Sequence, residues 1–382
     1  SNGSATIDNS GTFFLGGSGD LTRNSGTNTE FHNTGSIIKE DGGETGSSAT
    51  SLAQIDLTHA GSMEVRSGLL TLQGNHQISA PISVEGGATL RLDGGGTTTN
   101  LLAGASINGT GTVEQRSARL VVADGARVPI SNLMTPSGSG QVGGTGTLVI
   151  ANDTTLSRIR HEDAGTTEVP AGVTLTAGNN FQLSGGRTLH VLGGVDFPQT
   201  FFSSSNGGAT IAIDGTVNFT AGCTLSHGGG IFNLRNDGLF LCNPTGTNTV
   251  SLPPDSYTGS GQLRVESGRL QLTRTVTLTG TTEVLAGAEL ECNNLSFAPG
   301  STVKGTGLID GNINFAGTAA PGLSIGTLEV QGNADFAGGL LEIEVGNGSS
   351  DLLDVSGNAA LGGGSISLGP VTGHTPTAGD SC

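Results

Sequence analysis

The chain has 382 residues, of which 67 are glycine and only 12% are charged. Gly, Thr, Ser and Asn interrupt it too often for long helices, and the regular short strings of Val, Ile, Leu and Phe exclude a disordered chain. The net charge of −17, without a basic patch, argues against nucleic-acid partners, and no apolar run approaches the ~18 residues of a transmembrane helix, so we expect no membrane span.

Short alternating strands separated by glycine turns begin near the N-terminus. The same local unit occurs at residues 10–13, 34–37 and 60–63, roughly 25 residues apart. A unit this small cannot bury its own apolar face, whereas stacked copies can. The spacing therefore indicates a repeat architecture.

The sequence repeats itself further along the chain. The segments are 63–90 with 263–290 (MEVRSGLLTL with LRVESGRLQL), 165–175 with 280–290 (GTTEVPAGVTL with GTTEVLAGAEL), and Gly-Thr-Gly triplets at Gly109, Gly144 and Gly305. Glycine at such turns supplies positive φ and lets stacked backbones approach closely.

One dense charged segment, SRIRHED, occupies residues 157–163. It contains Arg158, Arg160, His161, Glu162 and Asp163. These side chains could bind an anionic glycan, but the pattern favours a solvated loop with internal ion pairs.

The cysteines offer one specific structural hypothesis. Cys223 occupies a position that small residues hold in the repeat copies, and Cys242 follows by about one coil. Equivalent positions on adjacent coils can reach the Cα separation of about 4.4–6.8 Å that suits a disulfide. A Cys223–Cys242 bridge is therefore a hypothesis that stands beside two buried free thiols; Cys292 and Cys382 have no obvious partner.

Near the C-terminus the alternation has a period of two residues. In GTLEVQG, Leu328 and Val330 should point inward while Thr327 and Glu329 face solvent. A coil of about 19–26 residues with two or three such strands has the size of a β-helix turn. We therefore predict an all-β fold, a parallel β-helix (β-solenoid) of roughly 16 coils that forms a single domain over residues 1–382. A sandwich or propeller is the alternative, but Asn-Gly and Asp-Gly turns are too few for it.

The stretch from residue 320 onward carries a family pattern. It reads Pro-Gly-x-Ser-x-Gly-x-Leu-x-Val-x-Gly from Pro321 to Gly332, then Asp-x-Leu-x-Val-x-Gly-x-Ala-x-Leu-Gly-Gly from Asp351 to Gly363. Residues 320–382 thereby resemble the passenger-associated β-strand repeat of bacterial autotransporters and related secreted surface proteins. The resemblance implies a right-handed β-helix, export from a bacterium, and a role at or beyond the cell surface.

The pattern of that family continues past TPTAGDS with an aromatic residue and another strand, whereas this chain stops at Cys382. A fragment of a longer protein, a processed form and a sister family with a different anchor all stay open. Repeat-like sequence reaches both ends without a capping helix, and an uncovered sheet edge invites another one. Head-to-tail stacking of identical chains into a filament would satisfy it.

Carboxylates are the candidates for catalysis. Glu342 and Glu344 share one strand face roughly 7 Å apart, a spacing that an inverting glycosidase could use but that any alternating strand produces. Asp351 is expected to cap the backbone of a turn. No histidine or cysteine spacing indicates a metal site, and no phosphate loop occurs, so we expect no metal, cofactor or catalytic residue.

These observations favour a non-catalytic extracellular structural β-solenoid. It would act as a cell-surface fibre, stalk or adhesin, at a bacterial surface or beyond it. The expected partners are further copies of the chain and surface glycans, with no nucleic acid. The alternative is a polysaccharide-degrading β-helix enzyme, either a lyase or a glycoside hydrolase.

Overall fold

The computed structural model describes residues 4–23, 29–41, 49–136, 140–198, 201–205, 207–346 and 348–371. The chain divides into two compact units, unit 1 (Ser1–His190 and Ser205–Ala209) and unit 2 (Val191–Ser204 and Thr210–Cys382). All regular elements of the described residues are strands, and parallel sheets stack as a β-solenoid of about 15 turns. The predicted all-β solenoid of roughly 16 coils is thus confirmed. Its description as a single domain stays a prediction.

Unit 1 has three strands in each turn, and each strand pairs in parallel with its equivalent in the next turn. The first face contains β1 (Ala5–Asn9), β4 (Thr29–Asn33), β7 (Ile55–His59), β10 (His76–Ile78), β13 (Thr98–Leu101), β16 (Arg119–Val122), β19 (Gly140–Gly143), β22 (Ile159–His161) and β25 (Phe181–Ser184). The second contains β2 (Thr12–Gly16), β5 (Ser36–Glu40), β8 (Ser62–Val65), β11 (Pro81–Val84), β14 (Ser106–Gly109), β17 (Arg127–Ile130), β20 (Thr147–Ile150) and β23 (Thr166–Val169).

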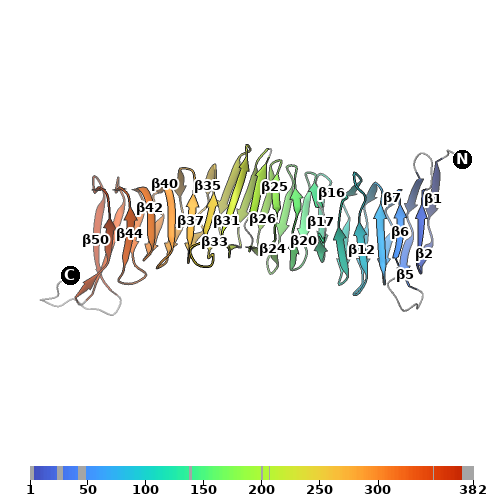
Figure 1. The fold of residues 1–382 in the computed structure, drawn as a ribbon, viewed down its shortest axis with the longest axis horizontal. Helices are drawn as coiled ribbons and strands as arrows, with labels where there is room; N and C mark the ends of the chain where they lie inside the picture. The colour runs from blue at the N-terminus through green and yellow to red at the C-terminus, as the bar shows by residue number, and fades with distance from the viewer. Residues whose placement is uncertain are drawn as a thin grey trace. The chain divides into compact units, whose positions relative to one another are not determined.

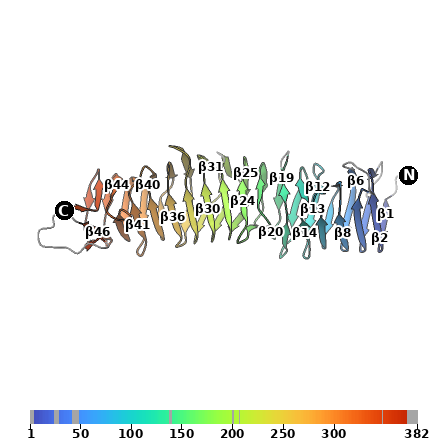
Figure 2. The same ribbon diagram turned by 90° about the horizontal axis from the view of Figure 1, so that it is seen from below.

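The remaining strands of unit 1 complete each turn. They are β3 (Gly19–Thr22), β6 (Ala49–Ala53), β9 (Leu69–Gln73), β12 (Thr89–Leu92), β15 (Thr112–Gln115) and β18 (Leu133–Met134) in one sheet, with β21 (Thr154–Leu156) and β24 (Thr174–Ala177) paired in another. Figure 1 draws these strands from blue to green, and Figure 2 gives the view from below. Strands β26 (Arg187–Val191), β28 (Phe201–Ser205) and β29 (Ala209–Ile213) contain residues of both units.

Unit 2 is built in the same way. One sheet contains β27 (Gly194–Phe197), β30 (Thr216–Phe219), β33 (Leu239–Cys242), β36 (Gln262–Val265), β39 (Thr281–Val284), β41 (Thr302–Gly305), β43 (Thr318–Pro321), β46 (Leu340–Gly346), β47 (Ser349–Ser350) and β50 (Ser365–Pro370), with β47 antiparallel to β46. Another face contains β31 (Cys223–Gly228), β34 (Thr249–Leu252), β37 (Arg269–Leu272), β40 (Glu289–Phe297), β42 (Leu308–Phe315), β44 (Thr327–Gln331) and β48 (Leu352–Val355). The other strands are β32 (Phe232–Asn236), β35 (Ser256–Thr258), β38 (Val276–Leu278), β45 (Ala334–Asp335) and β49 (Ala359–Ala360).

The register confirms the N-terminal repeat found in the sequence. Phe13 lies opposite Ile37, and Ile37 lies opposite Met63 in the next turn. These are the equivalent positions of the three aligned units. Ile37 and Met63 are buried, because period-two alternation places every second side chain inside the stack.

The Gly-Thr-Gly triplets form tight corners. Gly109 and Gly305 have φ of 114° and 124°, a region that residues with a side chain rarely adopt. A Cβ on either glycine would lie 2.0 Å from the carbonyl oxygen of a valine in the preceding turn, Val84 or Val284. The predicted need for positive φ and close backbone approach is confirmed at these corners.

The interior of each turn is filled by aliphatic and aromatic side chains. In unit 2, Phe297, Phe315 and Phe336 form a stack with ring centroids 5.3 and 4.7 Å apart, and none is more than 1% exposed. Leu328 and Val330 are also buried, as the sequence predicted. Stacking one aromatic ring per turn gives successive turns a continuous core.

Candidate functional site

Corners of different length create a hollow on the side of unit 1. The corner between β6 and β7 is the single residue Gln54, which has a φ of 59°. The next turn has Gly74 and Asn75 at this place, and the following turn has the longer loop 93–97. Because the longer loop projects further from the core than the short corner beside it, a depression forms above the short corner.

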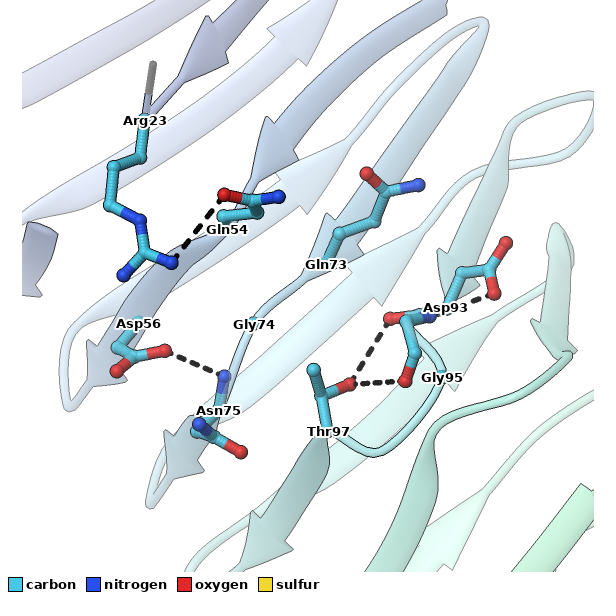
Figure 3. A pocket seen from close by; sticks show the side chains of 10 residues that line it. Arg23, Gln54, Asp56, Gln73, Gly74, Asn75, Asp93, Gly95 and Thr97 are labelled. Carbon is cyan, nitrogen blue, oxygen red and sulfur yellow. Dashed lines mark hydrogen bonds between the residues drawn. The ribbon is translucent and has the colours of Figure 1, made fainter. Parts of the chain in front are cut away.

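We call this hollow the Asp56 pocket. Its lining residues are Arg23, Gln54, Asp56, Gln73, Gly74, Asn75, Asp93, Gly94, Gly95 and Thr97. Its volume of about 670 Å³ lies in the range of ligand pockets. Figure 3 shows Arg23 and Asp56 on one side and Thr97 and Asp93 on the other, with Asn75 between them.

Hydrogen bonds to the backbone hold the lining in place. Asp56 Oδ1 accepts from the Asn75 N–H at 2.8 Å, and Asn75 Oδ1 accepts from the Thr98 N–H at 3.1 Å. Thr97 Oγ1 donates to the Gly94 carbonyl at 2.7 Å and closes its loop. The pocket is therefore formed by restrained side chains on adjacent turns.

Asp93 is held in its ionised form. Burial by itself would raise the pKa of its carboxyl group, but hydrogen bonds from Ser117 and the Gly94 N–H, together with Arg116 and Arg91, lower the pKa below its usual value. A general acid needs the opposite shift at neutral pH. Asp93 therefore suits hydrogen-bond acceptance better than proton donation.

The pocket offers both donors and acceptors. Among the described residues, the only hydrogen bond of the Arg23 guanidinium is to Gln54 Oε1 at 3.4 Å. Gln73 Oε1 accepts a hydrogen bond from Ser51 at 3.4 Å. In the part of the chain that the structure describes, no residue pairs with the amide nitrogen of Gln73 or with Oδ2 of Asp56, so both are available to a ligand. The arrangement can bind a polar molecule through several hydrogen bonds at once.

A buried histidine lies just inside this wall. His76 follows Asn75 in the chain and is 0% exposed, and its Nδ1 accepts from the Leu57 N–H at 3.3 Å. Burial lowers its pKa to about 4, although the Asp56 carboxylate opposes the shift. His76 is therefore neutral at physiological pH and supports the wall as a core residue.

The carboxylates weighed for catalysis lie in unit 2. Glu342 and Glu344 on β46 line a small hollow together with Lys304 and Asp351. Asp351 accepts hydrogen bonds from the Gly326 N–H at 2.9 Å and the Glu344 N–H at 2.8 Å, which confirms the predicted backbone cap. Asp351 is thus engaged in fixing the turn.

The interpretation of residues 157–163 as a solvated loop is wrong. Residues 159–161 form β22, and His161 is completely buried because the alternation of the strand turns it into the core. Glu162 and Asp163 pair with Arg119 at 3.2 and 2.6 Å. Arg119 belongs to β16, so these ion pairs join different turns, while Arg160–Glu162 at 3.7 Å is the internal pair.

No pattern in the sequence indicated that an arginine beside this segment is buried. Arg187 is 0% exposed and donates to Thr167 Oγ1 and to backbone carbonyl groups, including that of Gly144 at 3.0 Å. Burial lowers its pKa to about 10, partly offset by Asp163. Its hydrogen bonds to several turns make Arg187 a structural residue of the core.

The register removes the premise of the predicted Cys223–Cys242 bridge. The residue opposite Cys223 in the following turn is Val250, whereas Cys242 lies opposite Phe219 and Val265 in another sheet. Cys242 is a buried thiol whose pKa burial raises to about 12. The expected one-coil separation was wrong because the turn after Cys223 is longer than the sequence interval to Cys242. Cys382 lies outside the described residues.

Within the described ranges, no group of three or more His, Cys, Asp or Glu side chains is placed to hold a metal ion. The same part of the chain has no helix that is long and apolar enough to cross a membrane. No protein-family model, curated protein or solved structure matches the chain.

Sequence reasoning missed the pocket residues. Gln54 and Gln73, or Asp56 and Asn75, are single polar residues in unrelated local contexts. The members of each pair lie one turn apart, but they can be recognised as neighbours on the surface only when the strand register is known. A scan for polar residues repeated at the corner positions of aligned turns could have found them.

Proposed function

We propose that this protein is a non-catalytic structural β-solenoid that acts outside the cell or at a bacterial surface, as a fibre, stalk or adhesin. The observation that carries the proposal is the pairing of charged side chains between successive turns. In unit 2, Glu283 lies between Arg264 of the preceding turn at 3.5 Å and Lys304 of the next at 2.8 Å. In unit 1, Arg91 pairs with Glu114 at 2.7 Å.

We call these series of ion pairs between successive turns ladders, and they suit a structural role. The stability of a solenoid is approximately the sum of the stability of each turn and of its contacts with the next. One exposed pair contributes about 0–1 kcal/mol, but a series of pairs strengthens every turn-to-turn contact. A protein exposed to proteases and changing conditions benefits from this arrangement.

The location outside the cell is supported by the resemblance of residues 320–382 to the autotransporter repeat. An antibody raised against the purified protein tests it on cells of the source organism. Labelling of intact cells, or recovery from the medium, is expected. Labelling only after permeabilisation would contradict the proposed location.

The enzymatic alternative is tested separately. The purified protein is incubated with neutral and uronate polysaccharides, and new reducing ends and unsaturated uronates are measured. We expect neither product above a heat-denatured control. Product that disappears in Glu342→Gln, or in Asp56→Asn, would replace the structural proposal with a polysaccharide-degrading enzyme.

We also propose that copies of the chain stack end to end. Support comes from large apolar side chains exposed on the last described turn, Leu361, Ile366 and Leu368, at 50–72% exposure. Burial of such residues at a joint with a second copy would remove apolar surface from water at about 25 cal/mol per Å².

A further inference from the structure

We propose that the Asp56 pocket binds a neutral saccharide through the hydroxyl groups of an oligosaccharide chain. The inference gives the proposed surface protein a glycan partner. It rests on the proposed function only for the location of that glycan, outside the cell or at its surface. Binding itself is a property of unit 1 and can be measured on the purified chain.

The first argument is the alternation of donors and acceptors around the pocket. The Asp56 carboxylate accepts hydrogen bonds, while the amide nitrogens of Gln73 and Asn75 donate them. A sugar hydroxyl donates one hydrogen bond and accepts others, so neighbouring hydroxyls match a lining in which both kinds of group are interleaved. A ligand with one kind of group would leave half of the lining unpaired.

The second argument is charge. The free carboxylate of Asp56 opposes an anionic ligand such as a phosphate or a uronate, whereas the charge of Asp93 is offset by Arg116 and Arg91. The Arg23 guanidinium and the amide N–H groups oppose a metal cation, which needs oxygen ligands on all sides. The mixed lining therefore favours a polar molecule without net charge.

The third argument is extent. The side chains of Gln54, Gln73 and the 93–97 loop come from three successive turns, and adjacent strands lie about 4.8 Å apart. The lining thus extends over roughly 10 Å, which exceeds an ion and fits a short stretch of sugar rings. Because none of the described lining residues is aromatic, stacking does not contribute, and we expect a weak single site with a Kd on the order of 1 mM.

The lining is also prearranged for binding. Asp56 is fixed by the Asn75 N–H and Thr97 closes the 93–97 loop, so few side chains lose freedom when a ligand binds. Gly74 lets the wall lie close to the preceding turn, because a Cβ there would meet the Ile55 carbonyl oxygen at 2.2 Å. These contacts exist without a ligand.

The test uses the purified full chain and saturation-transfer NMR with calorimetry. The probes are cellotetraose, maltotetraose, mannotetraose and chitotetraose, with tetragalacturonate, inorganic phosphate and CaCl₂ as the competing chemistries. At least one neutral tetrasaccharide should bind the wild-type chain. Asp56→Asn keeps an oxygen for the Asn75 N–H but turns the free acceptor into a donor, and it should weaken binding about tenfold or more.

The chain provides a matched control. Asp153 Oδ1 accepts from the Thr174 N–H at 2.8 Å, the same hydrogen bond as that of Asp56, but lies outside the pocket. Asp153→Asn should leave the Kd within about twofold. Gln73→Ala is a second pocket variant that should also weaken binding, and melting curves of all variants check the fold.

Three results would overturn the proposal. One is that none of the four neutral tetrasaccharides binds. Another is that binding is unchanged in both Asp56→Asn and Gln73→Ala, or falls equally in Asp153→Asn. The third is that only tetragalacturonate, phosphate or calcium binds. Surface labelling of cells is independent of all three, so failure of this inference and failure of the proposed location are distinguishable.

Discussion

Acid should destabilise unit 1 through its buried histidines, because burial lowers the pKa of His59, His76 and His161 alike, and His76 provides the test. His76 has a pKa of about 4 in the folded chain, against an ordinary value of 6.5, because burial disfavours its charged form. Between these two pH values the unfolded chain binds a proton that the folded chain does not. Stability is therefore fully present above pH 6.5 and is lost as the pH falls toward 4.

The size of the effect follows from the two pKa values. Through His76, the free energy of unfolding should be about 2 kcal/mol lower at pH 5 than at pH 7, and about 3 kcal/mol lower at pH 4. His76→Asn removes the titration and keeps an oxygen that can accept from the Leu57 N–H. The variant will be less stable than the wild type at pH 7, because the smaller side chain leaves space in the core.

The assay is urea unfolding followed by circular dichroism at pH 7, 5 and 4. Other titrating groups are common to both chains and cancel in the difference between them. The free energy of unfolding of the wild type minus that of His76→Asn should fall by about 3 kcal/mol from pH 7 to pH 4. If this difference in the free energy of unfolding stays constant within about 0.5 kcal/mol, the assignment of His76 as a neutral buried group is refuted.

Further substitutions test the packing, the ladders and the end-to-end contact. Phe315→Ala, in the middle of the aromatic stack, should cost about 3–5 kcal/mol in chemical unfolding, and a loss below about 1 kcal/mol would contradict continuous stacking. Glu283→Gln leaves two cations of neighbouring turns without their shared carboxylate and should cost about 1–2 kcal/mol, less at 1 M NaCl; an effect independent of salt would argue against the ladder. Gly74→Ala should destabilise unit 1, since its Cβ meets a backbone carbonyl, and melting at the wild-type temperature would contradict that close approach. Leu368→Glu should abolish filaments seen by electron microscopy of the wild-type chain, whereas monodisperse wild-type particles would count against stacking.

The sequence predicted which short units align from turn to turn and that Leu328 and Val330 face the core. Phe13, Ile37 and Met63 lie in register as their alignment indicated, and Leu328 and Val330 are buried. These results depend on local rules: alternation with period two, and glycine at corners that need positive φ. The cap by Asp351 is local only in part: the Glu344 N–H lies close in the sequence, whereas the Gly326 N–H belongs to the preceding turn.

The pocket and the cysteines depended on information that no local pattern contains. Corner loops differ in length from turn to turn, so two residues with a plausible one-coil spacing can lie on different faces, as Cys223 and Cys242 do. Asp56 and Asp93 share a pocket because a one-residue corner lies beside a longer loop. By itself the sequence determined that the chain stacks short strands around an apolar core, since alternation and glycine turns act locally. Only the tertiary structure decided which polar residues meet at the surface, because strand register depends on the length of every preceding corner.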